Sequence, residues 1–422
     1  MVIKQDIPAL LVGIMSTMVS IGLARFSYTP LLPELIRQDW FSAHQAVYLG
    51  ASNLLGYFIG AIAAHQISER VRLRVLMNIC FVAVLLSFIG CALPLSFEWF
   101  FTWRLIAGIA GAILMVVGPA SVIALIPVER RASVGTLMFT GIGIGALLAA
   151  TVIPLLVQAS LMITWMVLAI MTLIAAWVND VNLVKLQDFR PIGLTRKHVT
   201  APDSQPRSDS STRSDASKPV THFSLVVLFV LIAYGFDALG FIPHTIFWAD
   251  FLAREQGLGT SVASFQWALF GAGAMCGPFI ARYGAQNFGW SNTLSTAFLA
   301  KAIAIMLPVL FIQYSSLDLI KYSISSFIVG AMVPGIVSLT SGRIAELVGP
   351  LQHKKYWGWA TAIFALAQAV SGYAMSGLYG YFESYHWLFF IASGLMSIGL
   401  VLSLLSAYVS AKREIKVSVS KY

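Results

Sequence analysis

Long runs of apolar residues, separated by short polar stretches, dominate the chain from residue 7 to residue 410. Each run has about 20 residues or more, which is the length that a helix needs to cross the hydrocarbon core of a bilayer. Six runs lie in the first half, at 7–33, 45–67, 74–94, 98–126, 133–157 and 160–178. Six more lie in the second half, at 223–249, 261–283, 292–313, 317–341, 356–380 and 386–410. The pattern predicts an all-α integral membrane protein with twelve transmembrane helices.

The stretch from Ala132 to Asn179 shows how two of these runs are divided. It holds no charged residue over 48 positions, about twice what one spanning helix requires. It therefore predicts two helices joined by an uncharged turn near Gln158 to Ser160. A transmembrane β-barrel is excluded, because its strands would be segments of about ten residues with alternating polarity.

The composition agrees with a membrane protein, since 58% of the residues are apolar and only 11% are charged. Soluble domains carry about 25% charged residues. A water-soluble enzyme, a disordered chain and a nucleic-acid-binding protein are excluded, despite the net charge of +9. Cys80, Cys91 and Cys276 all lie inside apolar runs, so we expect no disulfide framework and no metal site. Walker A and Ser/His/Asp motifs are also missing from the sequence, so we expect no cofactor and no catalytic residues.

The basic residues predict the orientation of the chain. With the N-terminus in the cytoplasm, 21 of the 27 lysines and arginines lie on the cytoplasmic side, and only Arg37 and Arg254 lie in outer loops. The positive-inside rule favours this topology, with both termini cytoplasmic. The sequence has no Asn-x-Ser/Thr acceptor, which is consistent with a multi-pass protein of a bacterial inner membrane.

The one extended hydrophilic stretch of the sequence lies between Asn179 and His222 and is rich in Ser, Asp, Arg and Pro. Such a stretch has little to bury and is typical of a flexible linker. We therefore expect an N-terminal six-helix bundle at 1–178 and a cytoplasmic linker at 179–222. A C-terminal six-helix bundle at 223–411 and a cytoplasmic basic tail at 412–422 follow.

The two halves of the sequence match one another at several positions. The pairs are Thr29 with Thr245 and Glu34 with Asp250 at an offset of 216, Gly56 with Gly277 at 221, and Trp165 with Trp387 at 222. A parallel repeat of six plus six helices, with a site at the interface, is a transporter architecture. The repeat predicts two pseudo-symmetric six-helix bundles.

Three motifs resemble the major facilitator superfamily (MFS). The string Gly22 to Pro33 looks like the uncharacterised YbfB-type branch. The string Trp103 to Gly111 resembles the family's arginine motif, and the string Gln368 to Gly372 is similar to a Gln-x-x-Gly element of the YbfB-type branch. The resemblance covers the full length of the chain. It implies the MFS fold, alternating access, a monomer, and a central cavity between spans 1, 2, 4 and 5 and spans 7, 8, 10 and 11. The loop after the second span departs from the family's gating pattern, because it lacks the aspartate and the inner glycine.

Two charged residues inside the predicted spans are candidates for function, because a charge in the hydrocarbon costs about 2.5–3.5 kcal/mol on insertion scales. Arg25 is predicted to hold an anionic substrate, since a guanidinium binds a carboxylate bidentately; an interhelical pair is the structural alternative. Asp237 is predicted to carry or gate a proton. Our hypothesis is that Arg25 and Asp237 pair in the substrate-free carrier and that substrate and proton separate them. A static buried pair is the alternative.

Other polar residues could line the cavity. His244 aligns with Tyr28 in the repeat, and both are predicted to present a polar tip to substrate; a structural hydrogen bond is the alternative for His244. Asn53 and Gln368 are further predicted substrate-binding residues. Arg104 matches the family's arginine motif, which the resemblance links to proton coupling and interdomain contact.

Glycines and prolines have a mechanical interpretation. The pairs that permit close backbone approach are Gly56 with Gly60, Gly141 with Gly145, and Gly273 with Gly277. The resemblance places the fifth helix against the eighth, so these pairs could form a sliding contact between the halves; tight packing inside one half is the alternative. Pro30 and Pro33 predict a break in the first helix. Lys301 is expected to snorkel or to form a pair rather than to bind substrate.

Together these features predict a proton-coupled secondary active transporter. Its substrate is predicted to be a small organic anion or zwitterion, such as a carboxylate metabolite or a chelator. A multidrug-type proton antiporter that exports cationic or apolar compounds, with Asp237 as the recognition charge, is one alternative. A membrane sensor that does not transport, and whose central loop binds a cytoplasmic partner, is the other. The expected partners are the substrate, protons and the lipid bilayer, with no nucleic acid.

Overall fold

The computed structural model describes residues 3–157, 159–188, 225–310 and 317–419, and all regular structure among them is helical. The first half contains η1 (Lys4–Asp6), α1 (Ile7–Thr17), η2 (Met18–Leu23), α2 (Tyr28–Arg37), α3 (Ala43–Arg70), α4 (Leu73–Cys91), α5 (Phe97–Leu125), α6 (Val128–Met138), α7 (Thr140–Val157) and α8 (Leu161–Asp188). The second half contains α9 (Leu225–Gly240), η3 (Pro243–Phe247), α10 (Trp248–Asp250), η4 (Phe251–Glu255), α11 (Gly259–Phe288), α12 (Trp290–Met306), η5 (Leu307–Val309), α13 (Leu317–Phe382) and α14 (His386–Val419).

Eleven helical segments among the described residues are long and apolar enough to cross a membrane. The long helix α13 supplies two of them, because its backbone bends at Gly349, which has φ 73°. The remaining long helix, α11, has 30 residues and is therefore about 45 Å long. It is not among the eleven, and its polar residues include the buried Gln266. The chain is thus a multi-pass helical membrane protein.

Two helices run beyond the predicted boundaries. α8 continues to Asp188, although the linker was predicted to begin at 179. The extension is held by Asp180, whose carboxylate accepts two 2.7 Å hydrogen bonds from Arg74 of α4. α14 likewise continues to Val419, into the predicted tail at 412–422. Most of the predicted linker at 179–222 lies outside the described residues.

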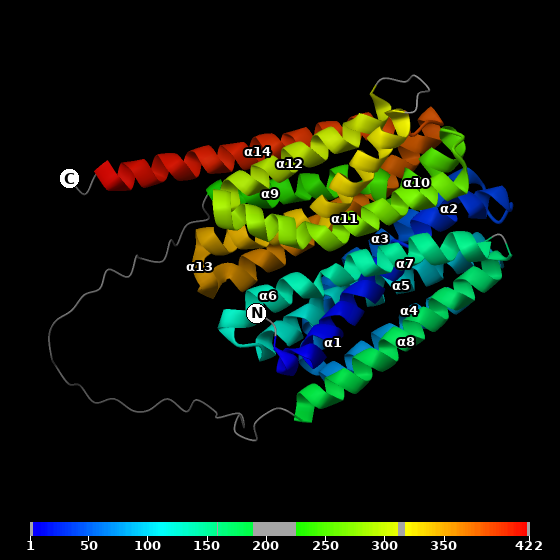
Figure 1. Ribbon diagram of the computed structural model, residues 1–422, viewed down its shortest axis with the longest axis horizontal. Coiled ribbons are helices and arrows are strands. Elements are labelled where there is room, and N and C mark those ends of the chain that lie inside the picture. The colour runs from blue at the N-terminus through cyan, green and yellow to red at the C-terminus, as the bar shows by residue number, and fades with distance from the viewer. Residues whose placement is uncertain (1–2, 158, 189–224, 311–316, 420–422) are drawn as a thin grey trace.

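Most of the long helices run between two opposite ends of the molecule (Figure 1). We call the end that carries residue 3, the end of α8, the start of α9 and the bend at Gly349 the termini end; it is on the left of Figure 1. We call the opposite end, where α2, α10 and the start of α14 lie, the far end. Elements of the first half gather in the lower part of that view and elements of the second half in the upper part.

The same set of close helix crossings is found inside each half. In the first half a side chain added at Gly56, Gly60 or Gly108 would meet the backbone carbonyl of Leu105, Ile109 or Asn53, respectively. In the second half Gly273, Gly277 and Gly330 meet the carbonyls of Phe327, Ala331 and Phe270 in the same way. The offset is 217 residues between α3 and α11, and 222 between α5 and α13. The predicted offset of 221, which matched Gly56 with Gly277, is therefore wrong by one helical turn, because both helices carry glycines four residues apart.

The glycine pairs pack inside each half and do not form a sliding contact across it. Gly56 and Gly60 face α5, and Gly273 and Gly277 face α13. Gly141 and Gly145 face α1 and η2; a Cβ atom on Gly145 would lie 2.6 Å from the Cα atom of Gly22. The prediction of a cross-half contact for these pairs is wrong, and the alternative of tight packing inside one half holds.

The close contact between α7 and α11 uses other glycines. A Cβ atom on Gly143 would lie 2.6 Å from the backbone oxygen of Gly271. Successive helical residues turn by about 100°, so Gly143 faces almost the opposite side from Gly141 and Gly145. The close contact between α7 and α11 therefore depends on Gly143 and Gly271.

Candidate functional site

The first spanning segment is broken in the middle of the protein. η2 is followed by a turn at 24–27, where the backbone N–H of Tyr28 bonds the carbonyl of Arg25 at 3.1 Å, one residue short of the α-helical partner. This leaves the carbonyl of Ala24 outside the helical ladder. Pro30 and Pro33 lie just after the break, in the first two turns of α2.

Three of the predicted residues gather around this break. Arg104 of α5 donates Nη1 to the Ala24 carbonyl at 2.8 Å, and Asn53 of α3 points its amide at the same oxygen at 3.5 Å. The guanidinium of Arg104 also lies 4.7 Å from the centre of the Tyr28 ring. The Tyr28 hydroxyl donates to the carbonyl of Ala46 at 2.6 Å. The predicted cavity-facing tip of Tyr28 is therefore wrong, because its hydroxyl is used inside the N-terminal half.

Arg25 and Gln368 meet across the boundary between the halves. Nη1 of Arg25, at the break, donates to Oε1 of Gln368 on α13 at 3.1 Å. The guanidinium carbon lies 4.6 Å from the centre of the Tyr57 ring on α3. Arg25 is only 5% exposed, and Gln368 is fully buried. The structure thus brings two of the predicted substrate-binding residues into contact.

This contact leaves several hydrogen-bond donors without a protein partner. Nε and Nη2 of Arg25 and Nε2 of Gln368 are buried, and none has an acceptor among the described residues. Elsewhere in the protein the same arginine edge holds carboxylates: Nε and Nη2 of Arg74 bind Asp180, and those of Arg130 bind Asp6. Buried unpaired donors are costly, and a two-oxygen anion would satisfy them. The arrangement can bind a carboxylate.

Asp237 does not pair with Arg25. Its carboxylate accepts a 2.5 Å hydrogen bond from Nζ of Lys301 on α12, and both side chains are almost fully buried. The Lys301 ammonium also lies 5.2 Å from the centre of the Phe241 ring. The predicted pair of Arg25 and Asp237 is therefore wrong, because Asp237 faces α12 inside the C-terminal half. The expectation that Lys301 forms a pair is confirmed.

His244 also faces the interior of the C-terminal half. Its Nε2 atom lies 2.8 Å from the hydroxyl oxygen of Ser325 on α13. Its ring stacks on Trp248 at 4.4 Å between centres and meets the ring of Phe389 edge-on at 5.1 Å. The prediction that His244 faces the cavity is wrong, because aromatic side chains and Ser325 surround the imidazole.

Tyr57 is the residue at this site that the sequence analysis missed. It stands one helical turn after Asn53 in an apolar run, and an aromatic residue there is indistinguishable from a packing residue in the sequence. Ser325, the partner of His244, was missed for a similar reason, since serine is common in membrane helices.

The halves are in close contact at the far end, beyond Arg25. The hydroxyl of Thr29 donates to the carbonyl of Thr245, and these are the two positions that the repeat matched at an offset of 216. The ring of Phe26 packs edge-on against Trp267 and Phe270, at 5.5 and 5.3 Å between centres. These contacts close the boundary on the far side of Arg25.

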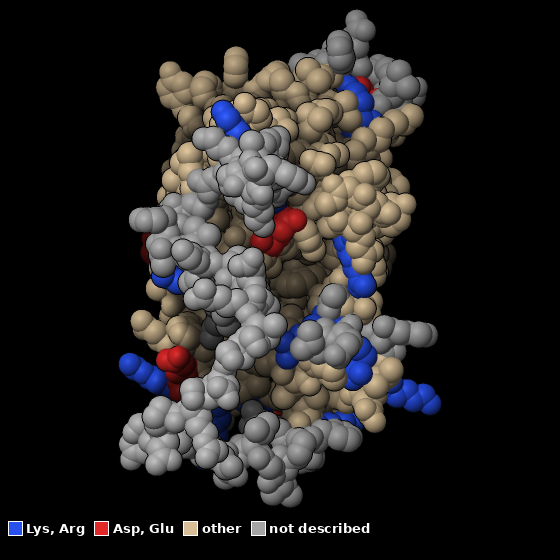
Figure 2. Space-filling model, turned by 90° about the vertical axis from the view of Figure 1, so that its left-hand side faces the viewer, with Lys and Arg blue, Asp and Glu red and all other residues tan. Residues whose placement is uncertain are grey.

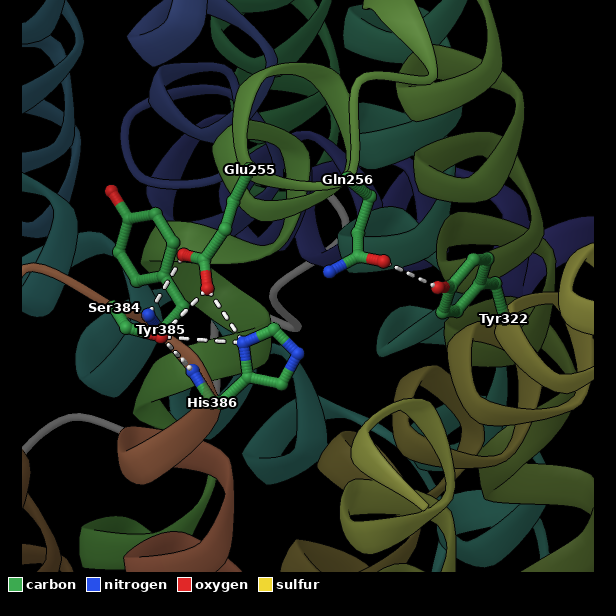
Figure 3. A network of polar contacts seen from close by, with 6 residues as sticks. All are labelled: Glu255, Gln256, Tyr322, Ser384, Tyr385 and His386. Atoms are coloured by element: carbon green, nitrogen blue, oxygen red, sulfur yellow. Dashed lines mark hydrogen bonds and ion pairs between the residues drawn. The ribbon is translucent and has the colours of Figure 1, made fainter. Parts of the chain in front are cut away.

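A network of polar contacts fixes the far end of the C-terminal half (Figure 3). The Glu255 carboxylate accepts from the Ser384 hydroxyl and from the backbone N–H of Tyr385, both at 2.8 Å, and lies 2.6 Å from Nδ1 of His386. The Tyr385 hydroxyl donates to Asp250 at 2.6 Å. Burial, together with the carboxylate of Asp250, raises the pKa of Tyr385 well above its usual value. The network ties η4 to the start of α14.

The termini end has a different surface. Figure 2 looks at this end and shows a hollow near the middle of the molecule, partly behind residues drawn in grey. On α13 the half-buried residues Trp357, Thr361 and Phe364 form one helical face that leads to the buried Gln368. The contact between the halves near this end includes a 3.3 Å hydrogen bond from Arg282 to Ser133. The contacts of Thr29 and Phe26 thus close the boundary between Arg25 and the far end, whereas the hollow lies at the termini end.

Comparison with known proteins identifies the family. The family model described as "Uncharacterised MFS-type transporter YbfB" matches residues 17–404. No curated protein sequence matches the chain. The matched region includes the broken first span, Arg25, Arg104, Asp237 and Gln368. The chain therefore belongs to the major facilitator superfamily, in the family of the uncharacterised MFS-type transporter YbfB.

Proposed function

We propose that this protein is a proton-coupled secondary active transporter that carries a small organic anion or zwitterion by alternating access. Twelve helices, α11 included, form two pseudo-symmetric bundles that rock about the contact of Gly143 with Gly271. The repeated crossings of α3 with α5 and of α11 with α13 support two equivalent bundles. The family match supports the transporter class.

The cluster of hydrogen-bond donors at Arg25 is the observation that supports an anion as the substrate. Three buried nitrogen atoms, Nε and Nη2 of Arg25 and Nε2 of Gln368, have no acceptor in the part of the chain that the structure describes. Arg25 belongs to the first half and Gln368 to the second. An anion between them contacts both halves, so its binding energy depends on how the halves are placed.

We propose that the termini end faces the cytoplasm of a bacterial inner membrane. Lysine and arginine side chains are frequent at that end and lie to the right of the hollow and below it, although an acidic side chain stands at its upper edge (Figure 2); the positive-inside rule expects such a basic surface on the cytoplasmic side. With this orientation the far-end contacts of Thr29, Thr245 and Phe26 close the outer side, and the conformation is inward-facing.

Proton coupling is assigned to the pair of Asp237 and Lys301. When Asp237 takes up a proton, its ion pair with Lys301 is lost, and when the proton leaves, the pair forms again. α9, which carries Asp237, is bonded to α13 by the hydroxyl of Ser371, which donates to the Leu239 carbonyl at 2.8 Å. Ser371 lies three residues after Gln368. A change at Asp237 can therefore reach the substrate site through α13.

Arg104 takes a positioning role in this proposal. Its bond to the Ala24 carbonyl holds the break that places Arg25 at the boundary. The multidrug alternative needs Asp237 as a free recognition charge, whereas Lys301 occupies that carboxylate. The sensor alternative depends on the predicted linker, most of which lies outside the described residues.

A flux assay tests the proposal. The full-length protein in liposomes is given radiolabelled acetate, benzoate, citrate or the lipophilic cation tetraphenylphosphonium, with and without an imposed pH gradient. We expect a carboxylate to be taken up faster with the gradient, and Arg25→Gln to slow that uptake at least about tenfold, since a charge-assisted bidentate contact is lost. Arg74→Gln is the control, because the guanidinium edge of Arg74 is occupied by Asp180.

Uptake of the cation alone would contradict the anion proposal and favour the multidrug alternative. Carboxylate uptake that ignores the pH gradient would contradict proton coupling. Absence of flux for all four probes in protein that still unfolds cooperatively would favour the sensor.

A further inference from the structure

We infer that the ligand at Arg25 is an aromatic carboxylate, a planar ring that carries a carboxylate group. The inference rests on the proposed function, because it takes Arg25 and Gln368 as the groups that hold the carboxylate. It adds the chemistry of the side chains that lie beside these two residues, on the way to the termini end.

The N-terminal half supplies one aromatic surface. The guanidinium of Arg25 lies over the Tyr57 ring, 4.6 Å from its centre. A carboxylate that accepts from both Nε and Nη2 lies in the plane of the guanidinium. α3 runs from the far end to the termini end, so Tyr57, four residues after Asn53, lies on the side of the site that leads to the hollow. A flat group attached to the carboxylate is therefore held beside an aromatic face.

The C-terminal half supplies a longer aromatic wall. Phe364 stands one turn before Gln368 on α13 and is half-buried. Its ring stacks on Tyr234 of α9, with 4.6 Å between centres and 28° between planes. Trp357, two turns nearer the termini end, lies 5.9 Å from the same Tyr234 ring. Gln368, one turn after Phe364, bonds Arg25, whose guanidinium lies over the Tyr57 ring, so the wall and the Tyr57 ring flank the same contact between the halves.

Several of the polar groups near these rings are already used. The Thr361 hydroxyl donates to the carbonyl of Trp357 at 2.9 Å, and the Ser371 hydroxyl donates to Leu239 at 2.8 Å. The Asn53 amide bonds the carbonyl of Arg104 at 3.2 Å. A ligand whose body carries many hydroxyls would therefore leave its own polar groups unpaired, which a site of this kind disfavours. An apolar body with aromatic faces fits better.

The site is closed toward the far end, so the apolar body of the ligand can extend only toward the termini end. Phe26, packed against Trp267 and Phe270, closes the boundary beyond Arg25. The carboxylate therefore points at Arg25 and Gln368, and the ring extends toward Tyr57 and Phe364. Because these two rings come from different halves, a bound aromatic ring links the halves as well as filling the site.

Equilibrium binding to the purified full-length protein tests the inference, with benzoate, cyclohexanecarboxylate and acetate as probes. Benzoate and cyclohexanecarboxylate have the same charge and a similar size, and only benzoate has an aromatic ring. We expect benzoate to bind about two- to tenfold more tightly than cyclohexanecarboxylate, the range of one favourable aromatic contact, and acetate to bind most weakly.

Phe364→Leu is expected to remove the preference for benzoate while leaving binding of cyclohexanecarboxylate. The control is Phe279→Leu on the exposed face of α11, which should keep the preference. Because the readout is a ratio of two affinities, a general loss of folded protein does not move it. Tyr57→Leu gives the same test from the other half if Phe364→Leu does not fold.

The outcomes separate the two proposals. Equal affinities for benzoate and cyclohexanecarboxylate, both lost in Arg25→Gln, would overturn the aromatic inference and leave the anion site in place. Binding of no carboxylate, or binding that Arg25→Gln does not weaken, would overturn both.

Discussion

The buried pair of Asp237 and Lys301 gives a prediction whose size follows from the structure. The two charged groups are 2.5 Å apart, and neither side chain is more than 2% exposed. Removing one partner leaves the other charge buried and uncompensated, which costs about 3–5 kcal/mol, whereas replacing a whole buried pair by apolar residues is often neutral or stabilising. We therefore expect Asp237→Leu and Lys301→Met each to be strongly destabilising, and the double variant to be close to the wild type.

The assay is reversible unfolding in mixed micelles, followed by tryptophan fluorescence. Since each 1.4 kcal/mol is a factor of ten, either single change should shift the unfolding equilibrium by roughly two to four orders of magnitude. Asp318→Asn is the control, because Asp318 and Lys321 form a partly exposed pair of the same chemical type, for which about 1 kcal/mol or less is expected.

Two results would refute this reasoning. One is a double variant as unstable as the sum of the single changes, since the cost would then come from lost packing rather than from an unpaired charge. The other is a pair of single variants no less stable than Asp318→Asn, since the pair would then be far better hydrated than its burial implies.

Two further predictions concern the contacts between the halves. A Cβ atom on Gly372 would lie 3.4 Å from the Cβ atom of Ala51, near the distance found in a disulfide. Oxidising the variant Ala51→Cys/Gly372→Cys, in a background without native cysteines, should therefore stop transport, and reduction should restore it. Turnover by the oxidised form would contradict closure at the far end. Gly143→Ala would place a Cβ atom 2.5 Å from the backbone nitrogen of Met275 in the other half, whereas Gly145→Ala would place one 2.6 Å from the Cα atom of Gly22 in the same half. At a similar loss of stability, Gly143→Ala should therefore change transport more than Gly145→Ala, which paired flux and unfolding measurements distinguish; the reverse order would contradict the assigned contacts.

Hydrophobic length predicts much of the fold, because the bilayer imposes the same requirement on every span. The runs at 7–33, 45–67 and 98–126 are all found as helical segments. α8 instead continues past its apolar run, and the ion pair of Arg74 with Asp180 in that extension is not recorded in the apolar pattern. The sequence therefore predicts which stretches are helices better than it predicts where they end.

The side-chain partners were harder to predict, because they depend on how each helix is rotated about its axis. Asp237 and Arg25 were correctly identified as buried charges, since few charged residues lie inside the apolar runs. Their pairing was wrong because a carboxylate on α9 can face α12 or the boundary, and the repeat offset does not decide between them. Gly141 and Gly143 show the same limit, since they differ by two positions and face different neighbours.

The central claim is that the free edge of Arg25 binds a carboxylate, and the comparison of benzoate with benzamide tests it most directly. The two ligands have the same ring, and only benzoate carries a negative charge. Isothermal titration of the wild-type protein and of Arg25→Gln, each with both ligands, gives the preference for the charged form. We predict that the wild type binds benzoate at least about tenfold more tightly than benzamide and that Arg25→Gln loses this preference. A wild-type protein that binds the two ligands equally, or a preference that survives in Arg25→Gln, would contradict the claim.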